Sequence, residues 1–202
     1  MSLPQAVIIA GGQGTRLGGV RKADLRVGGV RQLDRLVASL GTVARPILVA
    51  SGPRGQHLAL PRDCVAVPDR DSAHAGPLAG LIAAVAHLAE GGLTAGLLVS
   101  VAVDTCFLPD DFAARLRDGL GNAAAAYAAW GEDFYPPNAV WRLEALQDLP
   151  RLAGSGGPAS LKALQRRLGA QRVDWASGSS ANPFANINTL ADLLALQARA
   201  RQ

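Results

Sequence analysis

The sequence has few cysteines and no apolar run long enough to cross a membrane. Its only two cysteines, Cys64 and Cys106, lie far apart, which excludes a disulfide framework and a cysteine-based metal cluster. We expect both to be buried thiols in a reducing compartment. No apolar run reaches the ~18 residues of a spanning helix, and the first residues lack the basic and apolar succession of a signal peptide. We therefore expect a cytoplasmic protein with no membrane partner.

Charge is also scarce. Charged residues make up 18% of the 202 residues, below the usual ~25%, whereas hydrophobic residues make up 49%. This balance excludes a disordered chain, which could not bury enough apolar surface to offset its ordering entropy. Twenty basic and sixteen acidic residues leave a net charge of only +4, scattered along the chain, so we expect no nucleic-acid partner. The length predicts a single domain, residues 1–202.

The sequence does contain a succession of apolar strands and amphipathic helices. Strands are expected at 7–9, 46–50, 64–67, 97–103, 123–130, 139–141 and 172–175. Helices are expected at 33–40, 78–88, near Pro109, within 143–152 and 161–168, and after a Thr189–Asp192 capping box. Strands that are apolar on both faces are typical of a parallel sheet with both sides covered. The order predicts a three-layer α/β/α domain with a mostly parallel, twisted sheet.

Four loops of this predicted sheet come together at one edge. They follow Ile9, Ala50, Val67 and Val103, and right-handed crossovers place the ends of their strands side by side. Ligands of open α/β sheets bind at the carboxyl ends of the strands. We therefore expect the functional site at this edge.

The first of these loops, residues 11–22, is rich in glycine and carries Arg16 and Lys22. It is not a P-loop, because it lacks the Gly-Lys-Ser/Thr ending, and its glycine spacing is one residue too long for a dinucleotide fingerprint. Glycines let backbone amides surround an anion, and the two cations would supply the positive charge that a triphosphate needs. The alternative is an exposed turn with solvated cations. The carboxylates expected at the same edge favour a triphosphate site.

Carboxylate and amide oxygens follow later in the chain. Asp104 ends the most apolar strand, an unfavourable place for a charge unless a cation pairs with it. Mg²⁺ is typically held by one or two carboxylates and by substrate phosphates, so Asp104 suits it. The alternative role, a helix N-cap, would need Asp104 closer to Pro109. Asn186 and Asn188 are spaced to face one side of an extended segment, but by themselves indicate only loop hydrogen bonding.

Several motifs carry a family resemblance. Ala10-Gly11-Gly12-Gln13-Gly14-Thr15-Arg16-Leu17-Gly18, followed by Lys22, resembles the signature loop of nucleotidyltransferases with the Rossmann-like nucleotide-diphospho-sugar transferase fold. The ending Gly18-Gly19-x-x-Lys22-Ala23 is similar to that of molybdenum cofactor guanylyltransferases, which join GMP to molybdopterin. Three later segments agree with that family in order and spacing: Asp69 with Gly76-Pro77-Leu78-Ala79-Gly80, Asp104-Thr105-x-Phe107-Leu108-Pro109, and Asn186-Ile187-Asn188-Thr189. The resemblance implies an enzyme that uses GTP, molybdopterin and Mg²⁺ and releases pyrophosphate.

The resemblance also implies roles for individual residues. It divides the domain into a nucleotide-binding half, about 1–110, and an acceptor-binding half, about 111–202. Catalytic roles fall to Arg16, Lys22 and Asp104, and Mg²⁺ binding to Asp104 and Asn188, with Asn186 as a further candidate. Nucleotide contacts are implied for Ala10, Gly11, Gly12, Gly14, Thr15, Arg16, Lys22, Asp69, Gly76, Pro77 and Leu78. Asp71 is a local competitor for the role of Asp69.

The sequence differs from that family at positions expected to recognise the base and the acceptor. Ala50-Ser51-Gly52 stands where asparagine is common, which leaves the base open, and Tyr135-Pro136-Pro137 stands where a histidine before proline is common. Residues 156–160 lack the expected arginines, for which Lys162, Arg166 and Arg167 are candidate replacements. The alternatives are therefore CMP transfer to molybdopterin, nucleotidyl transfer to a sugar phosphate, and a non-catalytic nucleotide sensor.

Some residues and partners stay open at this point. Trp130, Tyr135 and Trp141 are candidates for a flat pterin pocket, the alternative being core packing. His74 lies in the loop before Gly76 without an assigned role. A transient cofactor-delivery protein is a candidate partner.

Overall fold

The structure, a computed structural model, is built around one seven-stranded sheet. It describes residues 2–11, 18–52, 58–69, 76–152, 157–178 and 180–201. The strands follow the order β5-β4-β1-β6-β8-β7-β9 across the sheet. Their bounds are β1 Gln5–Ile9, β4 Ile47–Ala50, β5 Cys64–Val67, β6 Leu97–Ala102, β7 Ala125–Trp130, β8 Asp133–Arg142 and β9 Gln171–Asp174.

Within the described chain, β8 is the one strand of this sheet that runs antiparallel to its neighbours. The cause is local: β7 and β8 are joined by only Gly131 and Glu132, and Gly131 has a φ of 55°. A two-residue connection can only form a hairpin, and its turn requires positive φ, which glycine adopts without strain. The prediction of a mostly parallel sheet is confirmed.

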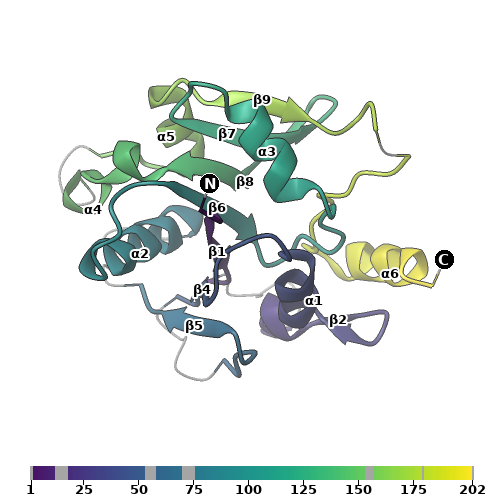
Figure 1. Ribbon diagram of the computed structural model, residues 1–202. Coiled ribbons are helices and arrows are strands. Elements are labelled where there is room, and N and C mark those ends of the chain that lie inside the picture. Colours follow the sequence, from purple (N-terminus) through teal and green to yellow (C-terminus); the bar gives the residue numbers. More distant parts are fainter. Residues whose placement is uncertain are drawn as a thin grey trace.

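Helices cover both faces of the sheet (Figure 1). On one face, α1 (Gln32–Ser39) buries leucines in a cluster shared with β1, β4 and β6, and α3 (Phe112–Leu120) packs on β7, β8 and β9. On the other, α2 (Pro77–Glu90) packs on β1, β4 and β5, and α5 (Leu161–Arg167) packs on β8. Because successive residues of a strand point to opposite faces, strands enclosed on both sides must be apolar throughout. The predicted α/β/α layering is confirmed.

The last helix lies apart from these layers. In Figure 1, α6 (Leu190–Arg199) lies beside the small β2–β3 hairpin, Arg26–Val27 and Val30–Arg31, and their contact buries a cluster that includes Val27, Ile187 and Leu196. Gln197 links the two, since its amide donates to the Arg26 carbonyl and accepts from the Gly28 amide, each at 2.8 Å. The end of the chain is thereby brought back to the loop that follows β1.

Three local expectations differ from the structure. The strand expected at 139–141 begins at Asp133, and the short strands β2 and β3 were not expected because two residues carry no periodic signal. The helix expected within 143–152 is instead a 3₁₀ turn, Leu143–Leu146, and a short helix α4, Leu149–Leu152. Pro150 explains the break, because proline fits the first turn of a helix but not its interior.

The two thiols differ in burial. Cys106 is fully buried, and burial raises its pKa to about 12, with Asp104 adding to the effect. Cys64 is only partly buried, because β5 is an edge strand of the sheet, so the expectation of two buried thiols is correct only for Cys106. In the part of the chain that the structure describes, no helix has the length and apolar character needed to cross a membrane.

Candidate nucleotide and acceptor site

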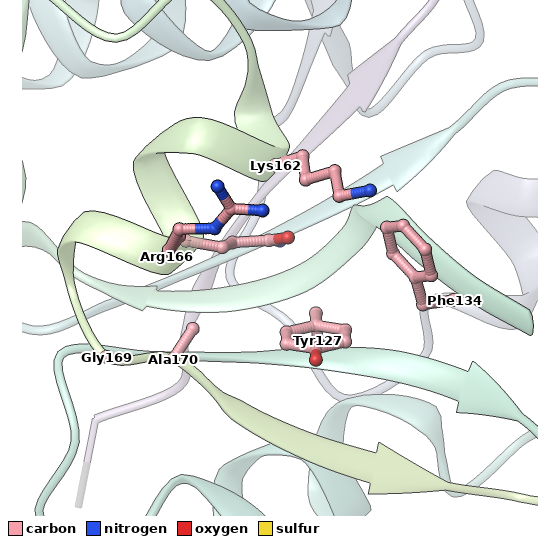
Figure 2. A pocket seen from close by; sticks show the side chains of 7 residues that line it. Tyr127, Phe134, Lys162, Arg166, Gly169 and Ala170 are labelled. Carbon is pink, nitrogen blue, oxygen red and sulfur yellow. The ribbon is translucent and has the colours of Figure 1, made fainter. Parts of the chain in front are cut away.

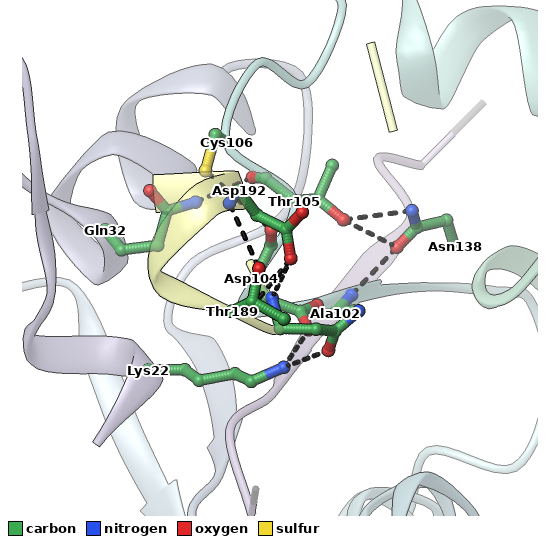
Figure 3. A network of polar contacts seen from close by, with 10 residues as sticks. Lys22, Gln32, Ala102, Asp104, Thr105, Cys106, Asn138, Thr189 and Asp192 are labelled. Carbon is green, nitrogen blue, oxygen red and sulfur yellow. Dashed lines mark hydrogen bonds and ion pairs between the residues drawn. The ribbon is translucent and has the colours of Figure 1, made fainter. Parts of the chain in front are cut away.

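Three residues predicted for the site meet at the carboxyl edge of the sheet. Lys22 Nζ donates to Asp104 Oδ2 at 2.6 Å and to Asn188 Oδ1 at 2.9 Å (Figure 3). Lys22 comes from the loop after β1, Asp104 from the turn after β6, and Asn188 from the segment before α6. The side chains of Lys22 and Asp104 are only 16% and 14% exposed, so each charge depends on the other for compensation. Residues up to 166 positions apart thus form one polar cluster.

The segment that carries Asn188 is fixed at both ends. Asn186 forms a β-bridge with Thr105, next to Asp104. On the other side, the predicted capping box is present: Thr189 Oγ1 accepts from the Asp192 amide at 3.2 Å. Asp192 Oδ2 accepts from the amides of Asn188 at 3.0 Å and Thr189 at 2.8 Å, and these backbone hydrogen bonds lower the pKa of Asp192. The capping box therefore also holds Asn188 in place.

A cavity of about 360 Å³ opens beside the cluster. Its walls come from both halves of the chain, and the predicted residues among them are Gly11, Lys22, Gly76, Pro77, Asp104 and Asn186. The opposite wall is the start of β8, residues 134–138, including Tyr135. Asn182 donates to the Tyr135 hydroxyl at 2.6 Å, and burial raises the pKa of this phenol.

A second group of predicted residues lies where β1 and β4 end. The backbones of Gly11 and Gly52 approach closely: a Cβ on Gly52 would lie 3.1 Å from Gly11 Cα, and 3.8 Å from Asp69 Oδ2. Asp69 Oδ1 and the Oγ of Ser51, which precedes Gly52, are buried and have no hydrogen-bond partner among the described residues. Burial raises the pKa of the Asp69 carboxyl. Buried polar atoms without partners are rare in folded proteins, so these two atoms mark a place for a polar ligand group.

The first turn of α2 faces the cavity. Gly76 precedes it with a φ of 81°, which glycine adopts readily, and Pro77 opens it. No side chain of the described residues caps this end of the 14-residue helix, so its first amides can face an anion. Two other predicted residues lie away from the cavity. Leu78 is only 2% exposed and packs in the core. Ala10 packs against the core, and its amide donates to the Ala50 carbonyl at 2.7 Å. Neither side chain lines the cavity.

A second cavity, also of about 360 Å³, lies on the other side of Phe134, between α5 and the β7–β8 hairpin (Figure 2). Lys162 Nζ lies 4.6 Å from the centre of the Phe134 ring, a cation–π distance, and Arg166 and Tyr127 line the same space. No acidic residue of the described chain lines it. Of the three candidate basic residues, Lys162 and Arg166 reach this cavity, whereas Arg167 is not among its lining residues.

Two of the three aromatic candidates are not pocket residues. Trp141 is fully buried and its Nε1 donates to Ser100 Oγ at 2.9 Å, and Trp130 packs against the core. Their side chains pack in the two core clusters between sheet and helices, so both residues have a packing role and neither lines the proposed pterin pocket. Tyr135 alone of the three lines a cavity. Gly12, Gly14, Thr15, Arg16, Asp71 and His74 lie outside the described residues.

The donor set next to Lys22 suits a hard cation. It comprises the Asp104 carboxylate, the Asn188 amide oxygen and Asn186 Oδ1, which is buried without a partner. The described residues contain no cluster of three or more carboxylate, histidine or cysteine side chains. An all-oxygen set with one carboxylate fits an ion such as Mg²⁺ that takes further ligands from phosphates, and does not fit zinc.

Sequence reasoning missed the residues that support this cluster. Gln32, Asn138 and Thr105 are each fully buried and are hydrogen-bonded to one another next to Asp104 (Figure 3), and Ser51 Oγ is a further buried polar atom. Asn138 is a polar residue followed by the apolar run Ala139-Val140-Trp141, and this is the signal that could have revealed it, whereas Gln32 lies among charged residues and carries no such signal.

Known proteins similar to this chain were found by sequence and by structure. A family model described as "MobA-like NTP transferase domain" matches residues 6–173. The chain is 37% identical over 198 residues to the molybdenum cofactor guanylyltransferase of Acidiphilium cryptum, covering 96% of this chain and 94% of that protein. It is 36% identical over 204 residues to the protein of the same name from Rhodobacter capsulatus, covering 97% and 96%.

Solved structures show the same fold. The molybdopterin-guanine dinucleotide biosynthesis protein A of Archaeoglobus fulgidus superimposes with a TM-score of 0.77 at 19% identity, covering 98% of each chain. The 2-C-methyl-D-erythritol 4-phosphate cytidylyltransferase of Thermus thermophilus superimposes with a TM-score of 0.67 at 21% identity, covering 100% of each.

Proposed function

This chain belongs to the MobA-like NTP transferase family, and we propose that it transfers GMP from GTP to molybdopterin with release of pyrophosphate. The observation that carries the proposal is the double contact of Lys22 Nζ with Asp104 and Asn188 in the wall of a cavity shared by both halves of the chain. It brings a cation and metal-binding oxygens together where two substrates would meet. Phosphoryl-type transfer needs this combination because it proceeds mainly by positioning and charge stabilisation.

The proposed reaction is an in-line displacement. An oxygen of the molybdopterin phosphate forms a bond to the α-phosphorus of GTP, and the bond from the α-phosphorus to the bridging β-phosphate oxygen breaks. The electron pair of the broken bond leaves with pyrophosphate, so no protein nucleophile takes part. Lys22 would contact the phosphates, and Arg16 stays a prediction for neutralising the pyrophosphate.

We propose Mg²⁺ as the metal, held by Asp104 with the amide oxygens of Asn188 and Asn186. The unpartnered Asn186 Oδ1 supports this assignment because it is a buried oxygen that an incoming cation would satisfy. When bound, the ion would offset the charge of the phosphates. Lys22 would then exchange part of its contact with Asp104 for a contact with phosphate.

Guanine is the base that suits Asp69 best. Its Watson–Crick edge presents N–H donors, and a buried carboxylate oxygen without a partner accepts them. Gly11 lines the first cavity, and a Cβ on it would lie 3.9 Å from Asp69 Oδ2, so a planar base that enters beside Gly11 could reach this carboxylate. Ser51 Oγ offers a further polar contact in place of the asparagine common in the family.

The second cavity suits the acceptor. Molybdopterin joins a flat ring system to a phosphate, and this cavity joins the rings of Phe134 and Tyr127 to the cations Lys162 and Arg166. Because Phe134 also lines the first cavity, an acceptor here would lie next to the nucleotide. The unpaired thiols of Cys64 and Cys106 are consistent with a cytoplasmic location, and a delivery protein that receives the product stays a prediction.

The direct test is pyrophosphate release from GTP, CTP, UTP and ATP, each with Mg²⁺ and molybdopterin. Release with GTP alone is expected. Release with CTP instead would make the protein a cytidylyltransferase, and release only with a sugar phosphate would assign it a sugar-nucleotide product. Stabilisation by GTP without release with any acceptor would contradict transfer and favour a nucleotide sensor.

A matched pair of variants connects the test to the site. Asp104→Asn removes the charge next to Lys22, whereas Asp118→Asn removes a carboxylate that is 71% exposed and pairs with neighbouring Arg117. The rate of pyrophosphate release is expected to be lost in Asp104→Asn and to stay at the wild-type level in Asp118→Asn. Equal activity in both would remove Asp104 from the mechanism.

A further inference from the structure

The turn that carries Asp104 is held by a side chain from the antiparallel strand. Pairing between β7 and β8 passes from Tyr127↔Ala139 to Ala128↔Tyr135, so residues 136–138 of β8 have no partner in β7. On its other side, β8 stops pairing with β6 at Ser100↔Ala139. The last part of β6 therefore pairs only with β1, as far as Ala102↔Ile9, and loses its backbone neighbour on the β8 side.

The interruption follows from the sequence Pro136-Pro137-Asn138. Proline has no amide hydrogen and cannot complete a ladder, so prolines in sheets lie at bulges or edges. The two proline carbonyls are satisfied by side chains instead: Gln165 donates to Pro136 at 2.8 Å and Ser100 Oγ to Pro137 at 2.7 Å. The bulge is thus an ordered feature that leaves the end of β6 in need of a partner.

Asn138 supplies that partner. Its side chain is fully buried; Oδ1 accepts from the Ala102 amide at 2.8 Å, and Nδ2 donates to Thr105 Oγ1 at 3.0 Å. One side-chain amide therefore holds both residues that flank the turn Val103-Asp104 (Figure 3). Gln32, also fully buried, donates to the Thr105 carbonyl at 2.8 Å from α1.

The same network reaches the asparagine segment. Thr105, held by Asn138 and Gln32, forms the β-bridge with Asn186. Asp104 and Asn186 therefore take their positions from one anchored residue. Asn138 is itself part of the cavity wall, yet its side-chain amide is hydrogen-bonded to Ala102 and Thr105.

We infer that Asn138 is a positioning residue that replaces the missing strand rung of β6 and thereby sets the placement of Asp104 and Asn186 for metal binding. The metal in this inference rests on the proposed function, whereas the position of Asn138 rests on its hydrogen bonds to Ala102 and Thr105. Residues that orient a metal ligand without touching the metal typically change metal affinity or activity by about 10- to 100-fold when replaced.

The test compares Asn138→Leu with Val140→Ala. Leucine removes both hydrogen bonds while it keeps the number and branching of side-chain heavy atoms, whereas Val140, fully buried on the same strand, cannot hydrogen-bond to the turn through its side chain and serves as a control for lost stability. In Asn138→Leu the Mg²⁺ concentration for half-maximal rate should rise about tenfold or more, with a smaller change in the KM for GTP. In Val140→Ala the Mg²⁺ dependence should stay that of the wild type.

Two further readouts do not depend on turnover. Mn²⁺ binding to the GTP-bound chain, followed by electron paramagnetic resonance without acceptor, should weaken in Asn138→Leu and not in Val140→Ala. Crystal structures of the wild type and Asn138→Leu should show Asp104 displaced from Lys22 in the variant. If Asn138→Leu does not fold, Thr105→Val should show a smaller change of the same kind, because it removes the contacts between Thr105 Oγ1 and the Asn138 amide but keeps the contact of Asn138 Oδ1 with the Ala102 amide.

Unchanged Mn²⁺ binding together with an unmoved Asp104 would overturn the inference. If the wild type transfers no nucleotide to any acceptor, the proposed function fails, and the position of Asp104 in the variant structure still decides the role of Asn138.

Discussion

The two cavities on either side of Phe134 differ in how their charges are compensated. In the first, Lys22 is paired with Asp104 at 2.6 Å and both are mostly buried. In the second, Lys162 lies over the face of Phe134, and neither it nor Arg166 forms an ion pair with any described residue. A cavity that holds both charges can bind a metal together with phosphates, whereas a cavity with cations alone can only attract an anion. This difference is the basis for the proposal that the first cavity carries out the transfer and the second binds the acceptor.

The largest effect is expected from breaking the ion pair of the first cavity. Asp104→Ala and Lys22→Ala should each lower kcat by about 10²–10³, because one charge-assisted contact made mainly in the transition state contributes that much. Stopped assays of pyrophosphate release measure it, with folding checked by circular dichroism. Near-normal kcat in either folded variant would remove that residue from the chemistry.

Removing the cations of the second cavity should affect binding instead. Lys162→Ala and Arg166→Ala should each raise the KM for the acceptor about tenfold, because a hydrogen bond to a charged group contributes ~1.5–3 kcal/mol. The KM for GTP should stay unchanged. Arg167→Ala, on the same helix but outside the cavity, is the matched control. An equal effect of Arg167→Ala would indicate nonspecific attraction and not a defined pocket.

Two helix caps offer a milder way to separate the cavities. Thr189 caps α6 beside Asn188, and Ser160 caps α5, which carries Lys162 and Arg166. Replacing either with alanine should lower the free energy of unfolding by about 1 kcal/mol. Thr189→Ala should raise the Mg²⁺ concentration for half-maximal rate and the KM for GTP. Ser160→Ala should raise the KM for the acceptor. If both variants changed the same substrate's KM, the two cavities would not be separate binding sites.

The smallest effect is a pH-dependent change in stability at Asp69. Burial raises the pKa of this carboxyl above 3.8, so the folded chain retains a proton where the unfolded chain has lost it, and stability falls as pH rises through that interval. Asp69→Asn should therefore raise Tm at pH 7, and the gain should fade as pH approaches 3.8. Thermal unfolding at several pH values, with Asp118→Asn as control, measures this. A gain that is independent of pH would contradict the assignment.

The two halves of the chain were not equally predictable. The strands around β1 and β6 are continuous apolar runs followed by Gly11 and Asp104, and parallel topology then requires those residues to share an edge. Periodicity and end signals, such as the Thr189–Asp192 capping box, are local properties and were read correctly. The meeting of Lys22 with Asp104 follows from these rules without further information.

The β8 region shows why the remainder could not be predicted. Pro136 and Pro137 argue against a strand, yet β8 passes through them because Gln165, Ser100 and Asn138 satisfy the interrupted ladder from elsewhere in the chain. Trp141 was a candidate for the pocket and is instead buried, because its strand position faces the core next to α2. Such outcomes depend on tertiary contacts that periodicity does not encode.

The most direct test is a crystal structure of the chain with Mg²⁺ and a non-hydrolysable GTP analogue. The account predicts the α-phosphate between Lys22 and Asp104, the metal on Asp104 and the asparagine oxygens, and the guanine against Asp69. A nucleotide bound elsewhere, with the contact between Lys22 and Asp104 intact and no metal on Asp104, would contradict it.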